Sequence, residues 1–287
     1  MRVCRFDDNR LGVVDGEHIL DVTAALDAIP ASTYTYPLPA FDPLIANLDK
    51  VLERARQLMA GAQRKKIGEV RLLSPVANPG KLVAAPVNYQ KHLEEARADP
   101  GIHHQSQVIE IQRIGLFLKA TSSLIGAGAP VAIRHHDRRN DHEIELAVII
   151  GKPGTGIKKD DAWDHIAAYT IGLDMTVRGP EERSLRKSVD SYSVLGPWMV
   201  TADEMGDATS LDFQLTVNGE PRQKANTRDL VLGIPELIEY ASAFYTLHPG
   251  DVIYTGTPEG VGPVRPGDVI VAEFEKIGRM EVAVTSA

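Results

Sequence analysis

Two glutamates one residue apart open an apolar run in the middle of the sequence, RNDHEIELAVII. If this run is a β-strand, Glu143 and Glu145 point to the same face, with their carboxylates about 7 Å apart. The residues that follow are apolar on both faces, which is typical of a strand buried on both sides. One interpretation is a solvated strand end that meets Arg138 and Arg139. The other is a divalent metal site of oxygen ligands, which Mg²⁺, Mn²⁺ and Ca²⁺ prefer.

A third oxygen ligand is available in AAYTIGLDMTVRG, where Asp174 lies between two apolar segments. With Glu143 and Glu145 it would complete a set of three carboxylates that leaves coordination positions open. The alternative is a turn or capping aspartate. Arg178 and Lys187 follow in the chain and could attract a substrate carboxylate, although a solvent-facing basic loop is an equally common role for such residues.

A histidine and a glutamate three residues apart occur in NYQKHLEEARADPG. The pattern predicts a short helix from Tyr89 to Ala98, which Pro100 and Gly101 would stop. His92 and Glu95 then lie on one face, and a carboxylate beside an imidazole suits a general base that activates water. The alternative is a surface helix with a Lys91–Glu95 ion pair.

The segment GDVIYTGTPEGVG concentrates small residues and threonines, including Thr257, directly after an expected strand. Small residues allow a ligand to approach the backbone closely, but the spacing matches neither a phosphate-binding loop nor a dinucleotide fingerprint. The histidine pairs at 103–104 and 135–136 suggest zinc. We discount them because adjacent residues of a strand face opposite ways.

The composition of the 287 residues is that of an ordinary globular protein, with 43% hydrophobic and 24% charged residues. A net charge of −8 argues against a nucleic-acid or membrane-surface binder. Cys4 is the single cysteine, so disulfides and thiolate zinc sites within one chain are excluded. We find neither an apolar signal segment nor an apolar run of bilayer length, and a cytoplasmic protein is the expectation.

Around these residues the pattern predicts an α+β, β-rich protein. Short strands and turns open the chain, and an amphipathic helix spans 41–63 and ends near Gly61. Further on we expect a hairpin at Asn218-Gly219, a helix with Pro235 in its first turn, and strands after the two PGDVI turns at 249–253 and 266–270. We predict a small N-terminal domain, 1–72, followed by a catalytic domain, 73–287.

Taken together, these motifs resemble the fumarylacetoacetate hydrolase family. VNYQKHLEE, LFLKATSSLIGAG, DHEIELAVIIGK, YTIGLDMTVRG, KSVDSYSVLGPWMV and TGTPEGVG are similar to its sequence blocks and follow in the same order. The resemblance covers roughly 73–287, and RLGVVDGEHILDVTAAL is similar to the smaller N-terminal domain of the family. It implies a rolled mixed β-sheet catalytic domain with a small N-terminal α+β domain, and a homodimer.

Carried over by position, the resemblance assigns roles to eight residues. It implies Glu143, Glu145 and Asp174 as ligands of Mg²⁺ or Mn²⁺, with Ca²⁺ possible in crystals. It implies His92 and Glu95 as a water-activating dyad on a mobile lid, and Lys187 as the cation near the reacting oxygen. Arg178 and Thr257 are implied as substrate contacts.

Two departures from the family pattern bear on the substrate. The aspartate that follows the arginine in the family is Gly179 here, which puts support for Arg178 in doubt. The segment 96–116 is longer than in compact members, and a long loop beside a site is often a lid or specificity element.

The predicted reaction is metal-dependent hydrolysis of a carbon–carbon bond in a small 2,4-dioxo acid, an acylpyruvate or a ring-fission product of aromatic catabolism. The carboxylate and 2-oxo oxygen of the substrate would chelate the metal, and His92 would activate water. Isomerisation or decarboxylation of a 2-oxo dioate on the same platform is the alternative. A non-enzymatic scaffold and a zinc hydrolase are further hypotheses.

Overall fold

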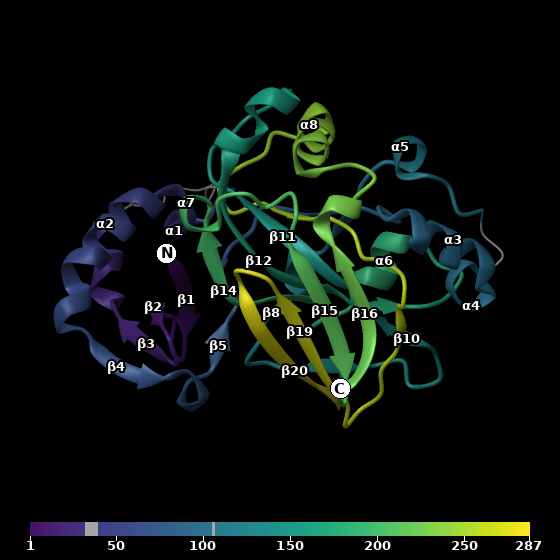
Figure 1. The fold of residues 1–287 in the computed structure, drawn as a ribbon, viewed down its shortest axis with the longest axis horizontal. Coiled ribbons are helices and arrows are strands. Elements are labelled where there is room, and N and C mark those ends of the chain that lie inside the picture. The colour runs from purple at the N-terminus through teal and green to yellow at the C-terminus, as the bar shows by residue number, and fades with distance from the viewer. Residues whose placement is uncertain (32–39, 105–106) are drawn as a thin grey trace.

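The computed structural model describes residues 1–31, 40–104 and 107–287 (Figure 1). The N-terminal strands are β1 (Arg2–Phe6), β2 (Arg10–Asp15), β3 (His18–Asp21), β4 (Gln63–Lys66) and β5 (Leu72–Leu73). The first helices are α1 (Pro43–Ala46) and α2 (Leu48–Leu58), with 3₁₀ turns at Thr23–Ala28, Met59–Gly61 and Ile67–Glu69. The helix predicted over 41–63 is therefore confirmed, with a break at Asn47 and an end at Gly61.

The largest sheet runs through both halves of the sequence. Its further strands are β6 (Leu82–Ala84), β7 (Phe117–Lys119), β8 (Leu124–Gly126), β11 (Ile144–Ile150), β12 (Ile166–Asp174), β14 (Ser193–Thr201) and β17 (Val252–Tyr254). The order is β4-β3-β2-β1-β14-β12-β11-β17-β6-β7, with β5 beside β1 and β8 beside β14. Because β1 pairs with β14, backbone hydrogen bonds cross the predicted boundary at 73. The division into two domains stays a prediction.

Two smaller sheets complete the β structure. One contains β16 (Glu220–Asn226), β15 (Asp212–Val217), β19 (Val269–Phe274), β20 (Gly278–Ser286) and β9 (Val131–Ile133), and the other β13 (Thr176–Val177), β10 (Asn140–His142) and β18 (Gly262–Pro263). Asn218 and Gly219 both have positive φ, as a tight hairpin between β15 and β16 requires, so that prediction is confirmed. The PGDVI turns lead into β17 and β19, as expected.

The remaining helices lie around the sheets. They are α3 (Gln90–Ala98), α4 (Pro100–His103), α5 (Ile111–Ile114), α6 (Arg183–Lys187), α7 (Ala202–Met205) and α8 (Ile234–Phe244), with 3₁₀ turns at Thr121–Ser123, Lys159–His165 and Thr227–Asp229. Figure 1 shows the N-terminal strands and α1–α2 at the left, β15, β16, β19 and β20 at the front, and α3–α5 at the right. Pro235 lies in the first turn of α8, as predicted. In the described ranges, no helix combines the length and the hydropathy that a membrane crossing requires.

Strand β11 is buried on both faces, as its sequence predicts. Leu146, Val148 and Ile150 join a core that also contains side chains of β15 and β19. Ala147 and Ile149 join a second core with side chains of β1, β2 and α2. The glutamates at the start of this strand are therefore held on a rigid element in the middle of the largest sheet. The β-rich α+β architecture with a mixed sheet is as expected from the sequence.

Candidate active site

The three predicted carboxylates meet at one end of β11 and β12. Glu143 directly precedes β11, Glu145 lies in it, and Asp174 is the last residue of β12, its antiparallel neighbour. The Asp174 N–H donates to the Glu143 carbonyl at 2.9 Å, which fixes the register of the two segments. All three side chains are buried, and one ligand oxygen from each lies within 4.8 Å of the others. In this carboxylate triad Glu143 and Glu145 lie together, as the alternation of the strand predicts, and Asp174 joins them from β12 as the proposed third carboxylate.

Two lysines compensate the charge of the carboxylate triad. Lys187 Nζ lies 2.6 Å from Glu143 Oε2 and 2.7 Å from Asp174 Oδ2. Lys119 Nζ donates to Asp174 and, at 2.9 Å, to the carbonyl of Tyr192. The triad therefore contacts two lysine charges, and a third positive charge from Arg178 through Glu143. Its donors are all carboxylate oxygens, and this donor set fits a hard divalent cation.

The protein environment shifts the pKa values of Glu143 and Glu145 in opposite directions. Burial raises the pKa of Glu145 well above its usual range, and the charges of Asp174 and Glu143 add to this, although Glu145 Oε2 accepts a hydrogen bond from Gly256 N at 2.6 Å. Burial also opposes ionisation of Glu143, but the charges of Lys187 and Arg178 outweigh it and hold the pKa of Glu143 below its usual range. Among the described residues, ionised Glu145 thus forms no ion pair, and a bound cation would supply the missing positive charge.

Arg178 is fixed by two carboxylates. Its Nε donates to Asp141 Oδ2 at 2.8 Å, and its Nη2 donates to Glu143 Oε1 at 2.9 Å. A Cβ at residue 179 would lie 1.7 Å from the guanidinium of Arg138, so that guanidinium fills the space a side chain would need. Support for Arg178 therefore comes from Asp141, and Gly179 makes room for Arg138.

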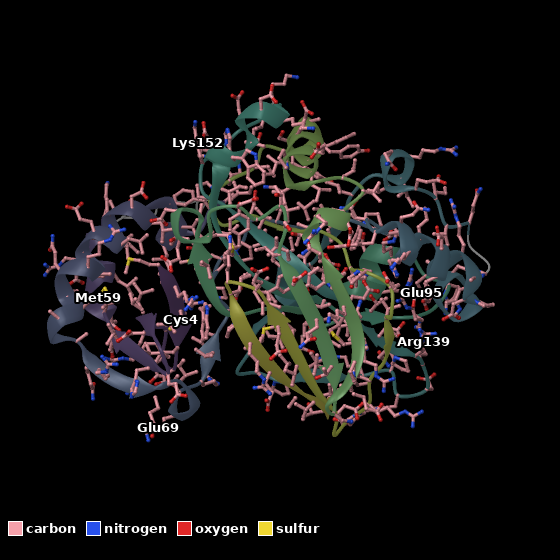
Figure 2. All side chains as sticks on the ribbon, viewed as in Figure 1. Cys4, Met59, Glu69, Glu95, Arg139 and Lys152 are labelled. Atoms are coloured by element: carbon pink, nitrogen blue, oxygen red, sulfur yellow. The ribbon has the colours of Figure 1, made fainter. Side chains whose placement is uncertain are left out.

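The predicted dyad lies on α3. His92 is buried and its Nδ1 lies 2.9 Å from Glu95 Oε2, while Glu95 Oε1 accepts from Gly260 N at 2.9 Å. Lys91 pairs with Glu259 at 3.6 Å and not with Glu95, which argues against the surface-helix interpretation. Glu95 is thus tied to the loop that follows β17. Figure 2 labels it at the right of the molecule, where α3 and α6 lie in Figure 1.

Thr257 lies on the loop after β17, where its hydroxyl donates to the carbonyl of Ile144 at 2.9 Å and accepts from Gln223 Nε2 at 2.8 Å. Gln223 Oε1 in turn accepts from the N–H of Ile144 at 3.2 Å. These bonds attach the loop to the start of β11. The role of Thr257 as a substrate contact stays a prediction.

One cavity of about 110 Å³ joins these elements. Of the predicted residues, those that line it are His92, Glu143, Glu145, Arg178, Lys187 and Thr257. Ile102, His103, Gln107 and Val108 of the long segment 96–116 form part of its wall, which fits the expectation that this segment contributes to specificity. Its movement as a lid, and the catalytic and binding roles of the eight residues, stay predictions.

Sequence reasoning missed two buried charged residues that contact the triad and Arg178. Lys119 lies in the quoted segment LFLK, and a lysine on the same face of a short strand as Phe117 is the signal that could have found it. Asp141 is fully buried between Arg139 and Arg178, and only the pairing of β10 with β13 shows that it joins them.

Comparison with known proteins identifies the family of this chain. The family model of the fumarylacetoacetate (FAA) hydrolase C-terminal region matches residues 81–285. The chain belongs to the fumarylacetoacetate hydrolase family. It is 58% identical over 288 aligned residues to a maleylpyruvate hydrolase of Aquipseudomonas alcaligenes, with both chains covered in full. It is 35% identical over 263 aligned residues to a mitochondrial oxaloacetate tautomerase of Homo sapiens, which covers 84% of this chain and 81% of the relative.

A solved structure gives the same assignment. The crystal structure of maleylpyruvate hydrolase from Sphingobium sp. SYK-6 in complex with manganese(II) ion and pyruvate superposes with a TM-score of 0.84, at 42% identity, over 100% of both chains. The prediction of a hydrolase that uses a divalent metal to cleave a carbon–carbon bond in a small 2,4-dioxo acid is therefore confirmed.

Proposed function

We propose that this family member hydrolyses maleylpyruvate or a close analogue and releases pyruvate. The observation that supports this most strongly is a cavity lined by His92 and by the two glutamates of the carboxylate triad, with Glu95 hydrogen-bonded to His92 and Asp174 completing the triad. The name of the relative from Aquipseudomonas alcaligenes supports the same substrate, and the Sphingobium structure holds manganese and pyruvate together.

The metal ligands in this proposal are Glu143, Glu145 and Asp174. A divalent ion there would act as a Lewis acid that stabilises negative charge on the oxygen of the substrate beside the bond that breaks. We propose Mg²⁺ or Mn²⁺ as this ion.

The His92–Glu95 dyad would activate the water. Because Nδ1 of His92 is engaged by Glu95, the imidazole in the tautomer that donates from Nδ1 keeps Nε2 as a proton acceptor. His92 Nε2 can then take a proton from the water that attacks the distal carbonyl. The N–H of Gly260 holds Glu95 in the orientation that selects this tautomer.

Two fixed cations would orient the substrate. Lys187 is buried at the triad and can donate to an oxygen that develops negative charge. Arg178 is held rigidly by Asp141, so its remaining guanidinium nitrogen can bind an oxygen of the substrate without reorganisation.

The test is direct. Purified protein is mixed with maleylpyruvate, acetylpyruvate or oxaloacetate, with and without Mn²⁺ or Mg²⁺, and both the diketone absorbance and released pyruvate are followed. Metal-dependent loss of the maleylpyruvate absorbance with release of one pyruvate per diketone supports the proposal, whereas pyruvate released from oxaloacetate reports decarboxylation. Loss of absorbance without pyruvate would contradict it and favour an isomerase or tautomerase, the reaction class in the name of the human relative.

We also propose an oligomeric state, a cellular compartment and a metabolic role for this protein. A homodimer in the cytoplasm, acting in the catabolism of aromatic compounds, fits the family resemblance and the sequence-based expectation. Light scattering on the purified chain would test the dimer, since a mass of about one chain contradicts it.

A further inference from the structure

Helix α6 brings further positive charge to the cavity. Arg183 and Arg186 line it together with the catalytic histidine and the triad glutamates. Both arginine side chains are half-buried. Burial lowers the pKa of Arg183, against the attraction of Glu143, because a cation held away from water lacks full compensation.

Apart from Glu145, whose partner would be the metal ion, the other carboxylates, lysine and arginine that line the cavity have charged partners among the described residues. These pairs join Arg178 to Asp141 and Glu143, Lys187 to Glu143 and Asp174, and Glu181 to Arg138. Among the described residues, by contrast, Arg183 forms no hydrogen bond or ion pair, and its guanidinium carbon lies 5.5 Å from the centre of the Phe117 ring. Arg186 donates to the carbonyls of Glu181 at 2.8 Å and Val177 at 3.5 Å, and no carboxylate of the described chain pairs with it.

An upper limit on the distance between Arg183 and Lys187, which contacts the triad, is compatible with one small substrate that bridges them. Lys187 Nζ also lies 5.5 Å from the centre of the Phe117 ring, so at most twice that distance, 11 Å, separates it from the guanidinium carbon of Arg183. The two carboxylates of a seven-carbon dioxo diacid are at most about 7 Å apart, at about 1.2 Å of reach per bond, and a cis double bond as in maleylpyruvate brings them closer. When the far carboxylate is hydrogen-bonded to an arginine, the guanidinium carbon lies a few ångströms beyond that carboxylate.

We propose that Arg183, assisted by Arg186, binds the far carboxylate of a dicarboxylic 2,4-dioxo acid and gives the enzyme its preference for such diacids over acylpyruvates with an uncharged tail. This inference rests on the proposed function, because it requires the near carboxylate to lie at the metal. A guanidinium binds a carboxylate through two parallel hydrogen bonds, and Arg183 has both edges available among the described residues.

The experiment compares kcat/KM for maleylpyruvate, a diacid, and acetylpyruvate, whose tail is a methyl group, in Mn²⁺-loaded protein. In Arg183→Gln the ratio of the two values should fall at least about 30-fold, because one partner of a desolvated charge pair is lost. Most of the loss should lie in KM for the diacid, and Arg183→Lys should recover part of it. The control is Arg113→Gln, which removes an exposed arginine of α5 that does not line the cavity.

Equal losses on both substrates, or an unchanged ratio in a variant that melts like the wild type, would overturn the assignment of Arg183. If acetylpyruvate turnover is too slow to measure, KM for maleylpyruvate decides, and a value within threefold of the wild type overturns it. Failure of the proposed function looks different, since the wild type would then release pyruvate from neither substrate.

Discussion

Replacing Glu95 by glutamine tests the dyad through the tautomer of one histidine. Glu95 accepts two hydrogen bonds, one from Gly260 N and one from His92 Nδ1, each at 2.9 Å. A glutamine has only one oxygen. If that oxygen stays on Gly260, the amide N–H₂ faces His92 Nδ1 and forces the proton onto Nε2, where it blocks proton transfer from water.

The size of the expected loss in kcat follows from the other orientation of the glutamine side-chain amide. If the amide turns over, its N–H₂ faces the N–H of Gly260, and an unpaired, partly buried donor costs about 1–3 kcal/mol. The active tautomer then becomes roughly 10- to 100-fold rarer, at 1.36 kcal/mol per factor of ten. Loss of the carboxylate that stabilises the protonated ring adds to this, and wrong-tautomer exchanges in other hydrolases cost up to about 10⁴-fold in kcat. We expect kcat of Glu95→Gln to fall by about 10²- to 10⁴-fold with little change in KM.

The assay is pyruvate release from maleylpyruvate at saturating Mn²⁺. Glu94→Gln is the matched control, because Glu94 lies on the same helix and, in the part of the chain that the structure describes, its carboxylate accepts only from the exposed Gln90 side chain, at 3.0 Å. A Glu95→Gln enzyme within threefold of the wild-type kcat, or one that loses only KM, would refute the reasoning.

Three further predictions concern stability and reactivity. Asp141→Asn leaves Arg139 and Arg178 without the buried carboxylate that they share, so the free energy of unfolding should fall by about 3 kcal/mol and the melting temperature by about 6 °C, whereas the exposed Asp137→Asn should change neither. Burial raises the pKa of Cys4 to about 12, so the thiol is protonated below that pH and should resist a thiol reagent at pH 8 until the protein is unfolded. Mn²⁺ at about 100 times its Kd should stabilise the fold by about 2.7 kcal/mol and raise the melting temperature by about 5 °C. The first prediction is contradicted if Asp141→Asn has the melting temperature of the wild type. The second is contradicted if Cys4 is labelled rapidly in the native protein, and the third if Mn²⁺ leaves the melting temperature unchanged.

The sequence was sufficient where chemistry and local periodicity agree. The alternation from Glu143 to Ile150 predicted a strand buried on both faces, and the structure has one there. Helical spacing similarly placed His92 and Glu95 on one face of α3, where they are hydrogen-bonded.

The contacts that the sequence could not supply depend on the order of the strands. Lys119 reaches Asp174 only because β7 pairs with β6, and β6 lies parallel to β17 across a long separation in the chain. The effect of Gly179 was also beyond local reasoning, because Arg138 from a different segment occupies the space. Pairings of this kind are long-range, and no local pattern encodes them.

We propose that Glu143, Glu145 and Asp174 together hold one divalent ion, on which the whole proposed reaction depends. Electron paramagnetic resonance of Mn²⁺ titrated into chelator-treated protein tests it most directly. We expect one tightly bound ion per chain in the wild type, a spectrum that changes when pyruvate is added, and a loss of at least about tenfold in affinity in Glu145→Gln, with the exposed Glu69→Gln unchanged. Equal Mn²⁺ binding by the wild type and Glu145→Gln, or no bound ion in either, would contradict the account.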